Sequence, residues 1–301
     1  MIRRIAAAFL LAPLLSAGEN PRLEFALGVL SECRGDTESA AAYFENARLA
    51  DPTAAPLVKR GVARRLETGD RAGAIKLFRD FAAARLDDLS AQLDYADFLA
   101  EQGRGDALAN KLATETLDTA LAKHPGHPEI IRRLVSIDRD RGDDLIAQLA
   151  TDDPASVLLY ATLSRSLHDA DDEANQAEID RRFQRALEAH PENPALARAA
   201  SEHFRLTKRR EQAIEMLKHH TRAAPWSLAL RVRLGILEFA AGRDDDGVAT
   251  LQELLAIAPR QALAHQALAK FYRLHDNPEA ASHHAAELLK IRGGSPSEFL
   301  K

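Results

Sequence analysis

The 301-residue chain has a single cysteine, Cys33, so no disulfide can form within it. It also lacks a strong excess of either charge, since 40 Lys and Arg residues are interleaved with 45 Asp and Glu residues. A nucleic-acid-binding surface needs a basic excess, so we expect no nucleic-acid partner. Aromatic residues make up only 5% of the sequence, and Gly and Pro are modest, while Leu and Ala are abundant. This composition favours a mostly helical protein.

Long apolar runs are missing too, except at the N-terminus. There, "MIRRIAAAFLLAPLLSAGEN" contains two arginines, an apolar run from Ile5 to Leu15, and small residues up to Gly18. This order is typical of a secretory signal peptide, so we expect cleavage after Gly18 and no membrane span in the mature chain. The alternative is an uncleaved anchor, but a bilayer-spanning helix needs ~20 apolar residues. The sequence therefore predicts an exported protein of the bacterial periplasm or cell envelope.

The lone Cys33 has two interpretations. An exported protein with one thiol can pair with another chain through it. The other interpretation, which we expect here, is a buried cysteine that packs as a small apolar side chain. The role of Cys33 stays open between the two.

The sequence also lacks catalytic and metal-binding motifs. It has no Gly-rich phosphate loop, no His-Glu-x-x-His and no Gly-x-Ser-x-Gly. The adjacent pairs His219–His220 and His283–His284 cannot easily share one ion, because neighbouring side chains on a helix point about 100° apart. The segment "GRDDDG" at 242–247 lacks the alternating ligands of a calcium loop. We therefore expect a non-enzymatic protein with no cofactor and no metal.

What the sequence does have is a regular period. The segment "GDTESAAAYF" at 35–44 returns as "GDRAGAIKLF" at 69–78. In the last third of the chain, Ala213, Gly247 and Ala281 repeat the same spacing. A fixed period of about 34 residues indicates stacked helical hairpins. We expect the small residues to lie where the two helices of a hairpin cross closely.

The residues at fixed places in these repeats resemble the tetratricopeptide repeat. That family has Leu and a small residue at the seventh and eighth places, Ala at the twentieth and twenty-seventh, a large residue at the twenty-fourth, and Pro at the thirty-second. The first repeat matches throughout, with Leu27, Gly28, Ala40, Phe44, Ala47 and Pro52. In a later repeat, His220 stands where Ala is usual. The resemblance covers nearly all of the chain after the signal peptide.

This resemblance implies an all-α fold, a right-handed superhelical α-solenoid of about eight stacked helix-turn-helix repeats. We place a signal peptide at 1–18, the repeat domain at 19–295 and a C-terminal tail at 296–301. The expected repeats are 21–54, 55–88, 89–127, 128–156, 157–193, 194–227, 228–261 and 262–295. Repeat 128–156 is short, because "DDLIAQLATDDP" leaves no room for a full second helix. Trp226 is expected to pack between repeats.

In this family the first helix of each repeat lines the inner groove. Carrying the inward-facing places over to the repeats from 128 onward gives seven basic residues, which are Arg132, Arg139, Arg165, Arg198, Arg205, Lys270 and Arg273. The N-terminal repeats instead give the acidic residues Glu67, Asp97 and Glu101, with Arg22 and Lys59 as exceptions. Arginine forks pair well with carboxylates, so we predict a protein or peptide partner with an acidic extended segment.

Two alternatives to an acidic protein partner stay open. One is a groove that binds an acidic polysaccharide or a small anion in an envelope export system. The other is a solvated helix face whose charges are matched by acids such as Glu202. The sequence as a whole predicts a non-catalytic protein-interaction scaffold, and it leaves the partner, the pathway and the oligomeric state open.

Overall fold

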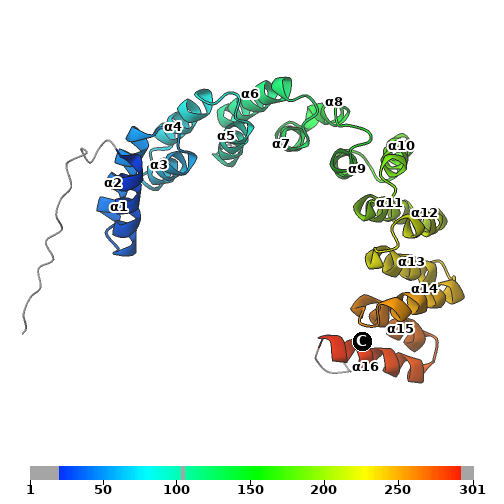
Figure 1. The fold of residues 1–301 in the computed structure, drawn as a ribbon. Coiled ribbons are helices and arrows are strands. Elements are labelled where there is room, and N and C mark those ends of the chain that lie inside the picture. The colour runs from blue at the N-terminus through cyan, green and yellow to red at the C-terminus, as the bar shows by residue number, and fades with distance from the viewer. Residues whose placement is uncertain (1–19, 103–105, 293–301) are drawn as a thin grey trace, which may run out of the picture. The chain divides into compact units, whose positions relative to one another are not determined.

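The structure, a computed structural model, describes residues 20–102 and 106–292. Within these ranges the chain forms helices joined by short loops and no β-strand (Figure 1). The elements are α1 (Pro21–Cys33), α2 (Thr37–Ala50), α3 (Ala55–Glu67), α4 (Arg71–Ala83), α5 (Leu89–Gln102), α6 (Ala107–Lys123), α7 (Pro128–Ile137), the 3-10 helix η2 (Arg139–Arg141), α8 (Gly142–Ile146), α9 (Pro154–Leu167), α10 (Glu173–Ala189), α11 (Pro194–Leu206), α12 (Arg210–Ala223), α13 (Leu228–Ala240), α14 (Asp244–Ile257), α15 (Ala262–Leu274) and α16 (Pro278–Arg292). The prediction of an all-α repeat solenoid is confirmed. The expected signal peptide, 1–18, and tail, 296–301, lie outside the described residues.

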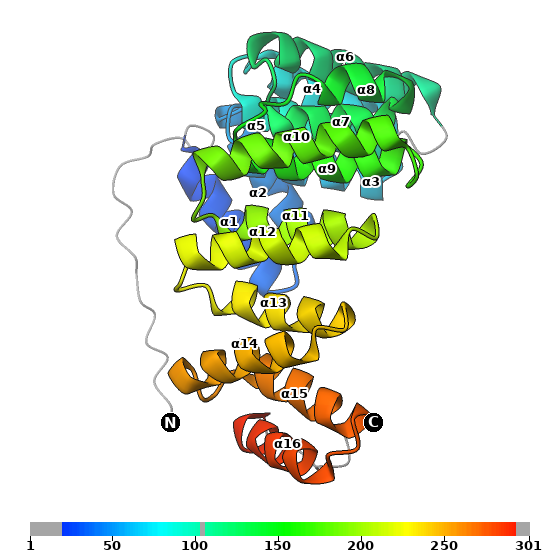
Figure 2. The same ribbon diagram turned by 90° about the vertical axis from the view of Figure 1, so that its right-hand side faces the viewer.

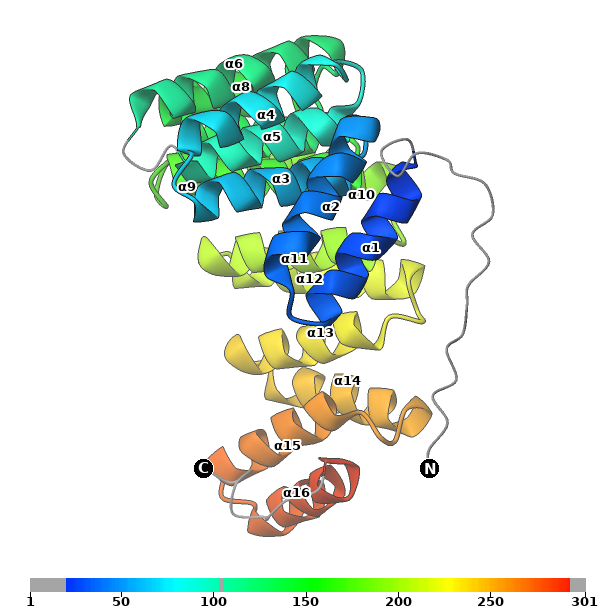
Figure 3. The same ribbon diagram turned by 90° about the vertical axis from the view of Figure 1, so that its left-hand side faces the viewer.

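The helices belong to two compact units that divide between Asp138 and Arg139. Unit 1 contains α1 to α7, and unit 2 contains η2 and α8 to α16. Within each unit most helices pack in pairs as hairpins, and the second helix of one hairpin packs on the first helix of the next. Figure 3 shows this order in unit 1, where the α1–α2 hairpin is followed by α3 and α4. In unit 2 the first helices α9, α11, α13 and α15 also contact one another in turn.

Small residues let the two helices of a hairpin cross closely, as the sequence predicts. A Cβ atom added to Gly28 of α1 would lie 2.6 Å from the ring of Phe44 in α2. A Cβ on Gly235 of α13 would lie 2.6 Å from Leu251 Cγ, and one on Gly247 would lie 3.0 Å from the carbonyl oxygen of Gly235. Real Cβ atoms essentially never approach other atoms to 2.6 Å, and 3.0 Å from a backbone oxygen is unusually close, so these crossings favour glycine.

In five of the described hairpins the turn between the two helices contains one residue with positive φ, and glycine takes this place in three of them. Gly35, Gly69 and Gly242 have φ angles of 76°, 79° and 74°. One repeat period before Gly242 and one period after it, the same place is taken by Lys208 and Asp276, with φ angles of 61° and 53°. A side chain in this left-handed region clashes with its own backbone, whereas glycine does not.

Lys208→Gly is therefore expected to stabilise the protein by roughly 0.5–1 kcal/mol, because it relieves this strain. Urea denaturation followed by circular dichroism measures the change. The matched control is Lys111→Gly on the exposed face of α6, where glycine lowers helix stability by roughly 1 kcal/mol. A Lys208→Gly variant that is as unstable as the control would show that the turn does not need glycine.

The loops between hairpins are held by side chains of the second helices. Four hairpins share one contact. A basic side chain on the second helix or just after it donates a hydrogen bond to a backbone carbonyl in the loop that precedes the first helix of the same hairpin. The pairs are Arg85 with Thr53 O, Lys123 with Leu86 O, Arg182 with Leu149 O, and His220 with Pro191 O. This explains why His220 departs from the family pattern, because its Nδ1 lies 3.0 Å from the oxygen that it serves. Burial lowers the pKa of His220, so the ring acts as a neutral donor.

The second helix predicted to be short is α8, with only five residues. A buried arginine of α10 supplies contacts at this place. The guanidinium of Arg182 lies 3.7 Å from the centre of the Tyr160 ring in α9, and it donates to Glu178 Oε1 at 2.8 Å and to Leu149 O at 3.0 Å. Arg182 thus joins α9, α10 and the loop after α8.

Two expectations about single side chains are wrong. Cys33 is exposed rather than buried, because it is the last residue of α1 and lies next to the turn. Trp226 is 63% exposed and does not pack between repeats. In the α12–α13 loop, Ala224 and Ser227 point inward, which leaves Pro225 and Trp226 on the outside.

Candidate functional site

The seven basic residues predicted to line the groove are all exposed. Arg132 lies on α7 in unit 1, and the other six lie in unit 2. Of these six, Arg139 lies in η2, Arg165 on α9, Arg198 and Arg205 on α11, and Lys270 and Arg273 on α15. We call α9, α11, α13 and α15 the first-helix row, because each contacts the next of the four. Five of the predicted residues therefore follow one row of helices.

The first-helix row carries seven Lys and Arg residues and two Glu, whereas α10, α12, α14 and α16 together carry eight Lys and Arg residues and twelve Asp and Glu. α9 and α15 contain Arg165, Lys270 and Arg273 and no Asp or Glu. The only acid of α13, Glu238, is buried with 1% exposure. In contrast, the second helix α14 carries four acidic residues and no Lys or Arg. Positive charge is therefore concentrated on the row.

One carboxylate on the row is shared by two arginines. Arg205 donates from Nε and Nη2 to the two oxygens of Glu202, at 3.0 and 2.5 Å. Arg233 of α13, which the sequence analysis missed, donates to the same carboxylate and to Ser201 Oγ. Hydrogen bonds from Arg205 and then Arg233 lower the pKa of Glu202 to about 2, against the opposing effect of burial. Two guanidinium groups and one carboxylate leave this cluster with net positive charge.

Two further predicted residues make local contacts. Arg132 Nη2 donates to Glu129 Oε2 of its own helix at 2.9 Å. Arg139 donates to the backbone oxygen of Ser166 and so links η2 to the end of α9. Exposed ion pairs contribute only about 0–1 kcal/mol, so a ligand can compete for the guanidinium of Arg132.

The remaining four predicted residues are Arg165, Arg198, Lys270 and Arg273. In residues 20–102 and 106–292 none of the four forms an ion pair. Their side chains are exposed on the first-helix row, and Arg165 is attracted to the Glu202 carboxylate beyond ion-pair distance. These groups are open to an anionic ligand.

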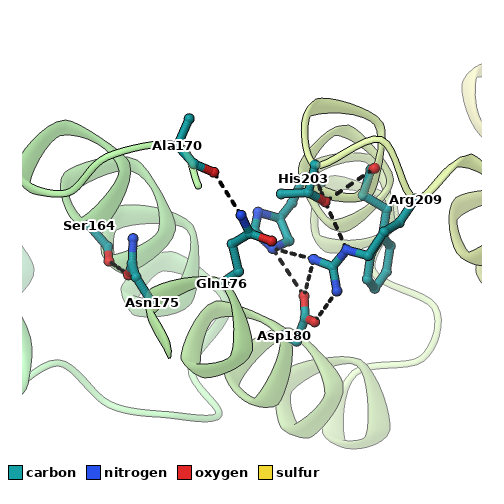
Figure 4. Close-up of polar contacts among 9 residues, drawn as sticks. Ser164, Ala170, Asn175, Gln176, Asp180, His203 and Arg209 are labelled. Carbon is teal, nitrogen blue, oxygen red and sulfur yellow. Dashed lines mark hydrogen bonds and ion pairs between the residues drawn. The ribbon is translucent and has the colours of Figure 1, made fainter. Parts of the chain in front are cut away.

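A second polar cluster joins α10, α11 and the turn after α11 (Figure 4). His203, which is 1% exposed, places Nε2 3.0 Å from Asp180 Oδ1, and Arg209 donates to both oxygens of Asp180. Burial raises the pKa of Asp180, but the hydrogen bonds from His203 and Arg209 outweigh it, so the net shift is downward. The sequence gives no motif for this cluster, since its members come from two repeats. Its charges are matched internally, so we assign it the structural role of fixing α10 against α11.

Within the described residues, no three His, Cys, Asp or Glu side chains gather as a metal site would require. In the same ranges, no helix has both the length and the apolar character needed to cross a membrane. The polar features of unit 2 are the basic groups along the first-helix row and the charge-matched network inside the α10–α11 contact.

Comparison with known proteins agrees with the repeat assignment. The family model for the tetratricopeptide repeat matches residues 206–271, from the end of α11 into α15. Similar solved structures include a tetratricopeptide repeat protein from Parabacteroides merdae, with 13% identity and a TM-score of 0.40 over 93% of this chain and 97% of that chain. Another is YrrB, described as a repeat protein of this family with an unusual peptide-binding site, with 15% identity and a TM-score of 0.37 over 71% and 92%. Among curated proteins, none matches this sequence. The family model supports the predicted tetratricopeptide repeat over residues 206–271, and proteins with this repeat generally act as non-catalytic scaffolds for protein–protein interaction.

Proposed function

We propose that this tetratricopeptide repeat protein is a non-catalytic scaffold that binds an extended acidic segment of a protein partner along the first-helix row. The observation that carries the proposal is the set of basic side chains on α9, α11 and α15 that form no ion pair within the described residues. Of these three helices, α9 and α15 contain no acidic residue. Arginine presents a planar fork that pairs with a carboxylate through two hydrogen bonds. A row of such groups suits a chain of Asp or Glu residues.

The setting that we propose is the bacterial periplasm or cell envelope. The support is the order of charged, apolar and small residues before Gly18. N-terminal sequencing of the natively expressed protein decides this point. A chain that begins near Glu19 agrees with export and cleavage, and a retained Met1 in the membrane fraction agrees with an anchor.

The affinity of such a site comes from several weak contacts. One exposed ion pair contributes about 0–1 kcal/mol, so a single carboxylate would give too little affinity for a specific complex. Several carboxylates on one segment act together, because the first contact raises the local concentration of the next. Since salt screens exposed charges, the complex should weaken as the salt concentration rises.

Charge reversal of four predicted residues tests the proposal. In the variant, Arg165, Arg198, Lys270 and Arg273 of the first-helix row are each replaced by Glu. We expect it to lose binding of a fluorescent Glu-rich peptide, measured by anisotropy at low salt, because the four cations become repulsive. Its helical signal and melting temperature should stay close to those of the parent, because all four side chains are exposed.

The control carries the same change of charge on second helices. It replaces the exposed residues Arg79, Arg181, Arg185 and Arg222 with Glu. Equal loss of binding in both variants, or no loss in the first, would contradict the proposal. A parent protein that binds an oligosaccharide of uronic acids but not the Glu-rich peptide would favour the alternative, a groove for acidic polysaccharide.

A further inference from the structure

Unit 2 has a groove between α10 and α12, two helices that Figure 2 shows in successive tiers. The groove has a volume of about 690 Å³. Its apolar lining comes from three helices, with Phe183 and Leu187 on α10, Phe204 on α11 and Met216 on α12. Because Phe183 and Leu187 are four residues apart, they lie on one face of α10, and the groove follows the axis of that helix.

The lining of the groove contains no Lys or Arg, and each wall carries an exposed carboxylate. On the α10 wall, Glu188 accepts a hydrogen bond from the neutral amide of Gln184 at 2.9 Å. On the α12 wall, Glu215 lies 3.5 Å from Arg243, a residue that also donates to Glu211. One guanidinium between two carboxylates leaves the Glu215 side of the rim negative. The groove is therefore apolar inside and acidic on both edges.

The polar cluster described above holds the helices of the groove against one another. Asp180 also lines the groove, and its carboxylate is bound by His203 of α11 and by Arg209 in the turn before α12. This network links the three helices that form the groove. It also matches the charge of Asp180, so the two rim carboxylates carry the unmatched charge.

We propose that this groove binds an amphipathic helix of a protein partner. Apolar side chains of that helix would enter between α10 and α12, and flanking Lys or Arg residues would pair with Glu188 and Glu215. A helix fits because two helical walls with an apolar floor offer the ridges and grooves that a third helix packs against. The two walls of the groove lie on α10 and α12, outside the first-helix row, and only its floor uses α11 of that row. The acidic rim selects the opposite charge from the basic row. It does not depend on the proposed function.

A peptide titration tests this proposal. Binding is followed by the NMR signal of Met216, the only methionine in the described residues. The chain has two methionines, Met1 and Met216, so selective 13C labelling of methionine methyl groups places a probe inside the groove. The ligand is a synthetic amphipathic peptide of Leu and Lys, and its counterpart has Glu in place of Lys. We expect the Leu–Lys peptide to shift the Met216 signal and the Leu–Glu peptide to leave it unchanged.

Variants at the rim test whether the Leu–Lys peptide binds in this groove or is attracted only by the overall charge of the protein. Glu188→Lys combined with Glu215→Lys should weaken binding of the Leu–Lys peptide about tenfold or more, since a change of about 1.4 kcal/mol is tenfold in affinity. The control, Glu253→Lys with Glu279→Lys, makes the same charge change at exposed places on α14 and α16 and should keep the affinity.

Three outcomes would overturn the proposal. The first is a Met216 signal that does not move on saturation with the Leu–Lys peptide. The second is an equal loss of affinity in the rim variant and its control, which would show a general charge effect. The third is a free chain that sediments as a dimer and becomes a monomer in the rim variant, which would show that a second copy occupies the groove.

Discussion

Gly247→Leu is expected to lower the free energy of unfolding by roughly 3 kcal/mol. Gly247 of α14 meets Gly235 of α13 where the two backbones cross, and an added Cβ would lie 3.0 Å from the Gly235 oxygen and 2.6 Å from Phe239 Cδ1. The ring of Phe239 is stacked on Phe271 of α15, with centroids 4.3 Å apart and planes 8° apart. Because neither the backbone nor the stacked ring can give way easily, the new side chain must push the helices apart.

Urea denaturation followed by circular dichroism measures this loss of stability. Hairpins in repeat proteins are stabilised by their neighbours, so hydrogen exchange should show the lost protection in α13 to α16 above all. The matched control is Ala249→Leu, which enlarges a side chain at an exposed place on the same helix and should change stability by less than about 0.5 kcal/mol. A Gly247→Leu variant as stable as this control would show that the helices do not cross at this glycine.

The sequence predicts such crossings because the contacts of a repeat fold are local. Gly28 and Phe44 belong to the two helices of one hairpin, and their contact follows from a pattern that recurs with a fixed period. The exposure of single side chains at helix ends does not follow from that period. Cys33 and Trp226 lie beside a turn and in a loop, where the local path of the backbone decides which side chains point outward. Both predictions were wrong for this reason.

For the candidate site, the repeat pattern predicted which helix most of the basic residues lie on and that they are exposed. It did not predict which side chains pair with one another. The place of Arg205 within its repeat was enough to predict an exposed residue on a first helix. That Arg233 of the next repeat shares Glu202 with it depends on how α13 packs on α11, which a repeat pattern does not describe. The groove between α10 and α12 was even less predictable from the sequence. Its apolar residues Phe183, Phe204 and Met216 come from three helices and form no motif.

A buried histidine pair makes the C-terminal hairpin sensitive to acid. Nδ1 of His265 in α15 lies 3.0 Å from Nδ1 of His284 in α16, and His265 Nε2 lies 2.9 Å from Pro259 O. With His265 Nε2 donating to that carbonyl, its Nδ1 accepts a hydrogen bond from His284. The ring of Tyr272 lies parallel to His284, with an angle of 4° between the planes. Burial and then the neighbouring His265 lower the pKa of His284 to about 4.

The direction of the pH effect follows from this pKa. An unfolded histidine has a pKa of about 6.5, so below that pH the unfolded chain binds a proton that folded His284 does not. The stability contributed by neutral His284 is therefore complete above about pH 6.5 and is lost as the pH falls toward 4. Between about pH 7.5 and pH 5, the free energy of unfolding should fall by about 2 kcal/mol through this group.

His284→Gln is expected to remove this dependence, because glutamine can donate to His265 but does not titrate. Urea denaturation at about pH 7.5 and pH 5 measures the difference for the parent and the variant, and the variant should lose about 2 kcal/mol less on acidification. His219→Gln, at an exposed histidine of α12, is the control and should retain the pH dependence of the parent. If His284→Gln and the parent lose equal stability at pH 5, protonation of the buried pair is not what weakens the fold in acid.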